Sequence, residues 1–440
     1  MPSSTIDFVK AFIALSFSLL LNHCCLAAAP VLQDTLVINQ KEAEGLFLNN
    51  NLDLIVQKLN INQAEAQVIQ AKLWPNPEFS VDEVNLWATK NQLSSGEKLP
   101  PIIGNFGKNQ QFSAALEQRI ETAGKRKKRI ALESVSREIA AEYYSELLRN
   151  LKTELRKNIF ALSYKQTFLT VLNNQNAALA KLLAAFENQF NQNNISKVEI
   201  FRLKALKLEL GQQILENRNE MHGVQKELSV LLNIPSQRYI QADIPIAVNL
   251  TGLNSRSLDN LQFTAVTNRP DGKISFLKET LASKKYDLEY AQRKPDLTLG
   301  ANYDRGGNFL LNFIGFGFKM DLPVFNRNQG NILESKIGIE KSKVLSEQKT
   351  KGIETEVTQV FRTLQNSLQA YQALDLDYVR DLDQVFQTYT DYFMQRRINM
   401  IEYLDFFDAY LSNKRTILTT TKQLNDSLED LNFVTASEIH

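Results

Sequence analysis

The stretch 297–322, LTLGANYDRGGNFLLNFIGFGFKMDL, has a side-chain alternation that decides the fold. Every second residue is apolar over 297–303 and again over 314–322, and turn-forming residues fill 305–308 between them. This period-two pattern predicts two β-strands that share one apolar face. Transmembrane barrel strands need about 9–11 residues with such an alternation. The residues that we expect to face lipid are Leu297, Leu299, Ile314, Phe316 and Phe318.

A weaker copy of the pattern occurs in the first half of the chain, over 79–87 and 112–120, with a long connector between the two segments. Four strands cannot close a barrel, and lipid excludes an open sheet edge. We therefore expect at least two chains, and by preference three, to share one barrel. A barrel of twelve strands is wide enough for a water-filled pore.

Helix-breaking residues are missing from long parts of the remaining sequence. No proline occurs between Pro101 and Pro235 or after Pro323, and no glycine follows Gly352. Such stretches, rich in Leu, Ala, Glu, Gln and Lys, predict long helices. A helix over 125–190 would be roughly 100 Å long at the usual rise per residue.

Two of these helices carry apolar residues at heptad spacing. The last helix has this seam at Tyr403, Phe407, Tyr410, Ile417, Leu424, Leu428 and Leu431. The earlier helix has it at Leu210, Ile214, Met221, Val224, Leu228 and Leu231. A heptad seam predicts coiled-coil-like packing. Taken alone, the seam fits the core stripe of a soluble helical bundle equally well.

The chain also contains an internal repeat. Residues 50–79 align without a gap with residues 268–297, so that Pro77 matches Pro295. Farther along, Ile195 matches Ile398 and the heptad seam follows. Both halves therefore have the same order of elements: a short helix, two strands and a long helical hairpin.

This organisation predicts a fold that is mainly α with a small β part. A duplicated unit forms long coiled-coil-like helical hairpins and supplies four strands to a shared, trimeric transmembrane β-barrel. The predicted divisions are a signal peptide at 1–27, a first repeat at 28–234, a linker at 235–262 and a second repeat at 263–440.

The N-terminal segment has the pattern of a secretory signal. Lys10 precedes an apolar run at 11–21, and small residues near Ala27 suit cleavage. The two cysteines, Cys24 and Cys25, fall in this segment, and acylation of Cys24 is an alternative to simple cleavage. No later segment has about 18 consecutive apolar residues, so the sequence predicts no transmembrane helix. The 50 basic and 49 acidic residues nearly balance, which argues against a partner such as nucleic acid.

Three motifs occur in order along the chain: WPNPEF at 74–79, EQRIETAGKRKKR at 117–129 and MDLPVFNRNQG at 320–330. With them the chain resembles the TolC-like outer-membrane efflux family, and within it the heavy-metal and cation efflux channels. The resemblance implies a homotrimer in the lipid of the bacterial outer membrane, with a helical tunnel in the periplasm. It also implies a periplasmic adaptor protein and an inner-membrane pump of the resistance-nodulation-division type as partners. The family often has glycine in the turns between its long helices, where Asn194 and Arg397 stand here.

We expect the turns at 191–197 and 394–400 to form the periplasmic tip. The predicted adaptor contacts are Asn193, Asn194, Ile195, Ser196, Arg396, Arg397, Ile398 and Asn399. Near this tip Glu402, Asp405 and Asp408 lie off the apolar seam and could repeat around the tunnel mouth as acidic rings. A plain solvated outer face fits these three carboxylates equally well.

The residues predict no catalytic, cofactor or metal site. Only His222 and His440 remain outside the predicted signal, and no metal-ligand cluster or catalytic motif occurs. The basic run 124–129 follows a predicted strand, and we interpret it as a charged girdle near lipid headgroups. The expected function is a passive exit duct, not an enzyme, for metal cations or drugs. A channel for type I protein or peptide secretion and an exported coiled-coil adaptor or scaffold are the alternatives.

Overall fold

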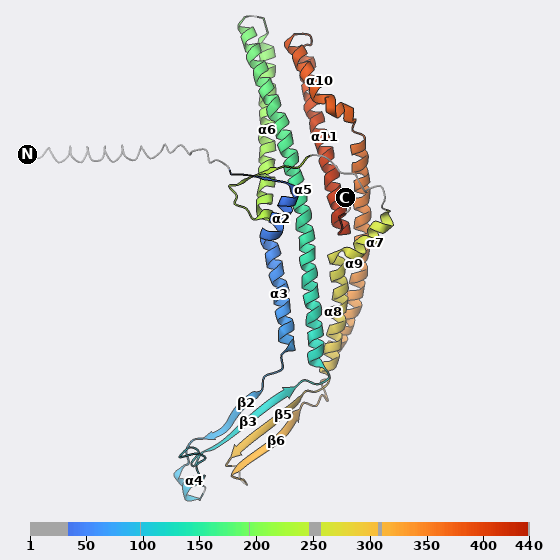
Figure 1. Ribbon diagram of the computed structural model, residues 1–440. Coiled ribbons are helices and arrows are strands. Elements are labelled where there is room, and N and C mark those ends of the chain that lie inside the picture. Colours follow the sequence, from blue (N-terminus) through green and yellow to red (C-terminus); the bar gives the residue numbers. More distant parts are fainter. Residues whose placement is uncertain (1–33, 97, 193, 246–256, 307–309, 439–440) are drawn as a thin grey trace, which may run out of the picture.

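The computed structural model describes residues 34–438 except 97, 193, 246–256 and 307–309. The predicted signal peptide and its cysteines lie outside this part of the chain. Figure 1 shows an elongated molecule with a β-sheet at one end, two helical tips at the other and shorter elements between them.

Four strands form one antiparallel sheet. They are β2 (Glu78–Asn85), β3 (Gln111–Ile120), β5 (Leu297–Arg305) and β6 (Asn312–Met320), in the order β2-β3-β5-β6. The two strands of each repeat pair with each other, and β3 joins the repeats by pairing with β5. The four predicted strands are therefore confirmed, and the sheet is one continuous layer across both repeats.

A row of helices continues this sheet. Helix α3 (Leu52–Lys72) leads into β2, β3 leads into α5 (Lys125–Asn191), α8 (Pro270–Gln292) leads into β5, and β6 leads into α9 (Gln329–Gln372). Helix α3 packs against α5, α5 against α8, and α8 against α9. The helices thus keep the order of the strands from which they extend, as Figure 1 shows.

Two hairpins form the far end. The first consists of the 67-residue α5 and α6 (Lys197–Leu232), and the second of α10 (Leu376–Met394) and α11 (Met400–Thr435). The long helix predicted before the second turn is divided into α9 and α10, and the chain bends between them (Figure 1). The Asp375 carboxylate accepts hydrogen bonds from the backbone N–H groups of Asp377 and Tyr378 and so starts a new helix. A capping side chain can therefore begin a new helix in a stretch without glycine or proline.

The repeat reaches farther than the sequence alignment. Helices α2 (Gln40–Asn50) and α7 (Leu258–Asn268) occupy matching places before α3 and α8, so the predicted single short helix is two helices in each repeat. At the break, Asn51 Nδ2 donates to the Leu231 carbonyl at 2.9 Å, and an Arg269 Nη donates to the Val434 carbonyl at 3.3 Å. Asn51 and Arg269 are equivalent positions of the two repeats, and so are Leu231 and Val434. The same side-chain-to-carbonyl contact therefore occurs at the helix break of each repeat.

The 235–262 segment contains a strand that the sequence did not suggest. Strand β4 (Tyr239–Ala242) pairs in parallel with β1 (Thr35–Ile38) beside α5 and α6. Ile38 and Ile240 are buried there. The predicted boundaries of the repeats and linker stay a prediction.

Buried ion pairs connect the repeats near the middle of α5. Arg156 is 9% exposed, and its guanidinium donates to Glu44 at 2.7 Å, Glu429 at 3.3 Å and Glu438 at 2.8 Å. Hydrogen bonds from Lys152 and Arg156 lower the pKa of Glu438 to about 2. Elements from both repeats therefore meet on one face of α5.

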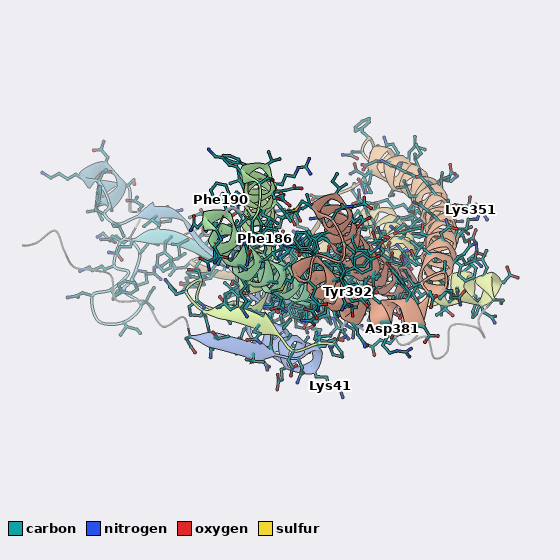
Figure 2. All side chains as sticks on the ribbon, turned by 90° about the horizontal axis from the view of Figure 1, so that it is seen from above. Lys41, Phe186, Phe190, Lys351, Asp381 and Tyr392 are labelled. Carbon is teal, nitrogen blue, oxygen red and sulfur yellow. The ribbon has the colours of Figure 1, made fainter. Side chains whose placement is uncertain are left out.

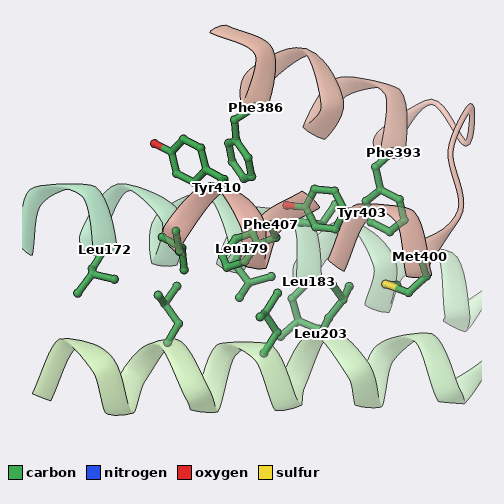
Figure 3. Close-up of a cluster of buried hydrophobic side chains, with 14 of the residues drawn as sticks. Leu172, Leu179, Leu183, Leu203, Phe386, Phe393, Met400, Tyr403, Phe407 and Tyr410 are labelled. Atoms are coloured by element: carbon green, nitrogen blue, oxygen red, sulfur yellow. The ribbon is translucent and has the colours of Figure 1, made fainter. Parts of the chain in front are cut away.

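The heptad seams form the core of the hairpins. In α11, Tyr403, Phe407 and Tyr410 are buried. Tyr410 stacks with Phe386 and Tyr403 with Phe393 of α10, whereas Phe407 meets Phe386 edge-on. Figure 3 shows these rings above a layer of leucines from α5 and α6. Aromatic pairs of this kind contribute about 0.5–1.5 kcal/mol each beyond the burial of their area. The seam prediction is confirmed.

A membrane-spanning helix needs a minimum length and a high apolar content. Among the residues that the structure describes, no helix combines the length and the apolar content needed to cross a bilayer.

Candidate functional site

One face of the four-stranded sheet is mostly apolar. The register places Ala301 between Leu116 and Phe316, and Leu116 opposite Phe79. The alternation continues along the strands with two departures: Gln118 stands on this face opposite Leu299, and the register of β2 shifts between Asp82 and Asn85. Of the five residues predicted to face lipid, Leu297 is half-buried, whereas Leu299, Ile314, Phe316 and Phe318 are exposed by 45%, 66%, 85% and 73%. The structure places all five on this face, which we call the outward face.

The opposite face of the sheet is polar or small. Glu117 lies beside Gly300, which lies beside Gly317, and Lys319 Nζ approaches the Glu117 carboxylate at 3.9 Å. Phe313, near the end of the sheet that is remote from the helices, is an apolar exception. A face of this kind can line water while the outward face contacts lipid.

The sheet and the helix row are open at the same two edges. Among the described strands, β2 and β6 each have a partner on one side, and α3 and α9 end the helix row next to them. Both edge helices carry exposed apolar side chains. These are Ile55, Leu59 and Ile69 on α3, and Leu333, Ile337 and Val344 on α9.

The basic run 124–129 holds the junction between sheet and helices. Lys125 Nζ forms an ion pair with Asp296 at 2.7 Å, and the Arg126 guanidinium lies 4.1 Å from the centre of the Trp74 ring. Arg129 pairs with Glu121. Gly124 begins α5 with a left-handed backbone at φ 70°, which glycine adopts without strain. Lys125, Arg126 and Arg129 therefore make contacts within the chain, and the charged girdle near lipid headgroups stays a prediction.

The two predicted tip turns lie close together. An Arg396 Nη donates to the Asn194 carbonyl at 3.3 Å, so the hairpins touch at their ends. Figure 2 looks along the helices and shows the first hairpin beside the second, with Phe186 and Phe190 on one and Tyr392 on the other. Asn193 lies outside the described residues.

The turn residues divide into exposed and packed groups. Ile195 and Ile398 are half-buried against the aromatic core, whereas the remaining described ones are exposed: Asn194, Ser196, Arg396, Arg397 and Asn399. The residue with the left-handed backbone is Arg396, at φ 59°, and not Arg397. The Arg397 guanidinium lies 5.5 Å from the centre of the Tyr392 ring instead.

Capping boxes begin both returning helices. Ser196 bonds with Glu199 at the start of α6, and Asn399 bonds with Glu402 at the start of α11. The Glu402 carboxylate accepts the Asn399 backbone N–H at 3.0 Å. One of the three predicted tunnel-mouth carboxylates therefore also caps its helix.

The other two carboxylates gather near a third from α6. Asp405 and Asp408 are exposed on α11. Partial burial and the nearby carboxylates of Glu209 and Asp405 raise the pKa of Asp408. The sequence did not single out Glu209, because its relation to α11 depends on how the two hairpins pack.

Metal binding inside the chain finds no support in the described part of the structure. No group there of three or more His, Cys, Asp or Glu side chains could hold an ion.

The apolar sheet face, the polar opposite face and the long helical extension together define the fold class of TolC-like outer-membrane channel subunits. A solved structure described as CusC, with conformational changes accompanying folding and transmembrane channel formation, superposes with a TM-score of 0.70 at 18% identity, covering 93% of this chain and 97% of that one. The outer membrane protein VceC from Vibrio cholerae superposes with a TM-score of 0.67 at 13% identity, covering 91% and 97%. These likenesses confirm the resemblance at the level of the fold.

A curated relative is the cobalt-zinc-cadmium resistance protein CzcC of Cupriavidus metallidurans, 22% identical over 293 residues. The match covers 66% of this chain and spans 64% of the length of that relative. No protein-family model matches the chain.

Proposed function

We propose that this chain is the outer-membrane channel subunit of a tripartite efflux system. The observation that carries the proposal is a four-stranded sheet that has one apolar and one polar face, continues into a row of helices and is open at both edges. Strand β2 runs away from the helices and β6 runs towards them, so β6 of one copy can pair antiparallel with β2 of the next. Head-to-tail pairing of this kind closes into a ring.

Three copies would give twelve strands and a helical tunnel. The strands would span the outer membrane, because a closed barrel leaves no backbone group unpaired in lipid. The tunnel would extend into the periplasm and carry substrate passively, with no catalytic step and no cofactor. The exposed apolar residues of α3 and α9 support this closure, since they would be buried between copies.

The proposed partners bind at the tip end of the tunnel. The tip turns at 191–197 and 394–400 are the proposed contact with a periplasmic adaptor, which would connect the channel to an inner-membrane pump of the resistance-nodulation-division type. Of the tip residues, Arg396 offers a sharp test because it is exposed and its side chain bridges to the other turn. Arg396→Asp should reduce adaptor binding, whereas Arg380→Asp, farther along α10, should leave it unchanged.

We propose that the exported substrates are metal cations, and drugs are the second candidate class. The likeness to a relative named for cobalt, zinc and cadmium resistance supports this choice. Glu402, Asp405 and Asp408, together with Glu209, would then place negative charge along the route near the tip. Rings of carboxylates favour the passage of cations.

The experiment begins with fractionation of cells that express the full chain. A detergent-stable trimer in the outer membrane that dissociates on heating, and that conducts cations in a planar bilayer, is the expected result. A monomer in the periplasmic fraction would overturn the proposal and point to an adaptor or scaffold instead.

A further inference from the structure

The connector between β2 and β3 contains a small ordered hairpin, residues 99–109, which we call the outer hairpin. Leu99 and Asn109 bond to each other twice, with the Leu99 N–H donating to Asn109 Oδ1 at 3.1 Å and the Asn109 N–H donating to the Leu99 carbonyl at 3.0 Å. At the turn, the Ile102 N–H donates to the Phe106 carbonyl at 2.7 Å. The hairpin lies at the end of the sheet remote from the helices.

Arg305 fixes the outer hairpin to the sheet. This side chain is 1% exposed, and its guanidinium donates to the carbonyls of Pro100 and Gly107, one on each arm of the hairpin. It also donates to Asn312 Oδ1 at 3.1 Å. Gly107 permits this approach, because a Cβ there would stand 2.9 Å from an Ile102 side-chain carbon and 3.4 Å from Arg305 Nε. Two hydrogen bonds from one buried side chain therefore attach the hairpin to β5.

The strand register shows on which side of the sheet the hairpin lies. Arg305 is paired with Phe112 and Asn312, and the Phe112 ring contacts that of Tyr303 with 5.9 Å between centres. Tyr303 and Ile314 are paired on the outward face, and Arg305 lies two residues farther along the same strand. Arg305 and the hairpin above it are thus on the apolar side of the wall and not over the polar side.

This position suits the charge of Arg305. An uncovered arginine on a lipid-facing wall is costly, and the cost falls towards the membrane interface. Two backbone carbonyls of the hairpin and Asn312 accept hydrogen bonds from its two Nη groups, whereas the buried Nε has no hydrogen-bond partner among the described residues. The hairpin accordingly marks the outer boundary of the apolar surface.

The hairpin presents two kinds of exposed side chain. Its turn carries Ile103 and Phe106, exposed by 78% and 62%. Lys98 and Lys108 are exposed and stand next to the bonded pair at its base. Apolar side chains flanked by lysines bind to membrane interfaces that carry negative charge.

We propose that the outer hairpin binds the outer leaflet of the membrane, with Ile103 and Phe106 in the apolar edge and Lys98 and Lys108 on the phosphate groups of an anionic glycolipid. The inference rests on the proposed function, because it takes the sheet as part of a membrane barrel. The occupant follows from three observations: continuity with the outward face, the positive charge at the base and the distance from the periplasmic tips.

The first test locates the turn by fluorescence quenching. Trp74→Phe and Trp87→Phe remove both tryptophans, and single tryptophans are then introduced as Phe106→Trp, Phe316→Trp and Phe201→Trp. The proteins are reconstituted with lipids brominated on their acyl chains. Quenching at 106 and 316, but not at 201 on the exposed face of α6, is the expected result.

The outcomes separate the two proposals. Loss of quenching at 106 with strong quenching at 316 overturns the hairpin inference and leaves the barrel intact. Loss of quenching at 316 overturns the proposed function itself.

The second test measures how much Lys98 and Lys108 contribute to the affinity for an anionic glycolipid. The purified trimer is titrated with lipid A, a bisphosphorylated glycolipid, and with phosphatidylcholine. Lys98→Gln with Lys108→Gln should weaken lipid A binding about thirty-fold, as two lysines near an anionic surface predict. The matched control is Lys207→Gln with Lys226→Gln, two exposed lysines of α6. Equal affinity in both pairs would overturn the assignment of Lys98 and Lys108 to phosphate.

Discussion

At the residue scale, the face on which a side chain stands decides its role. Phe313 and Phe316 belong to the same strand, yet the register puts Phe316 on the outward face and Phe313 on the polar one. Alternation along a strand makes this difference visible in the sequence. The sequence could not show that Arg305, which continues the apolar series, is covered by a hairpin from the other repeat.

Phe316→Arg tests the outward face. A cation on a lipid-facing barrel position costs about 2–4 kcal/mol near the bilayer centre, so we expect a sharp loss of the heat-modifiable trimer in outer-membrane fractions. Phe313→Arg, three residues earlier on the polar face, is the control and should cost far less. Similar trimer yields from the two variants would contradict the assignment.

Asp408→Asn tests the acidic group near the tip. Because its folded-state pKa is raised, ionised Asp408 destabilises the folded protein above its ordinary pKa of 3.8, and this effect disappears at lower pH. The group is exposed and screened, so the variant should gain only about 0.5 kcal/mol at pH 7 in low salt and nothing near pH 3. Thermal unfolding at both pH values measures this.

Glu347→Gln, at an exposed position in the middle of α9, is the control and should show no such gain. A gain at pH 3 equal to that at pH 7 would mean that charge is not the cause.

At the element scale, local signals and helix caps set where the elements begin and end. The start of α11 was visible in the sequence through the match with α6, and Asn399 and Glu402 form the capping box there. Glycine and proline do not predict the break before α10, because the new helix begins with the capping carboxylate of Asp375.

Asp375→Ala tests that break. Loss of a side-chain cap costs about 1 kcal/mol of stability, and α10 should fray at its start. Chemical denaturation and hydrogen exchange of the first turn of α10 measure both effects. Asp377→Ala, in the first turn but not the capping position, should cost clearly less, and an equal cost would show that capping is not what begins α10.

At the scale of the whole molecule, the two open edges are the surfaces on which the proposed assembly depends. Apolar side chains on α3 and α9 are exposed in one chain, and the sheet edges beside them are unpaired among the described strands. The proposed channel would close both edges by joining copies head to tail.

Leu333→Glu with Ile337→Glu should prevent that joining, since each glutamate would be buried without a partner between copies, at a cost of several kcal/mol together. Sedimentation in detergent should show monomer instead of trimer. Lys341→Glu with Lys343→Glu adds the same side chains at exposed polar positions of α9 and should retain the trimer. A trimer from the first pair would exclude α9 as an edge of the assembly.

The sequence by itself determined the strands, the long helices, the heptad seams and the duplication, because each depends on periodicity and on neighbours along the chain. Only the tertiary structure decided that β3 pairs with β5, that Arg396 takes the left-handed turn position and that Arg156 collects carboxylates from both repeats. These contacts join segments more than a hundred residues apart or depend on how two hairpins meet. These contacts are stabilised by burial and by charge pairing between distant segments, and a local sequence pattern contains no information on either.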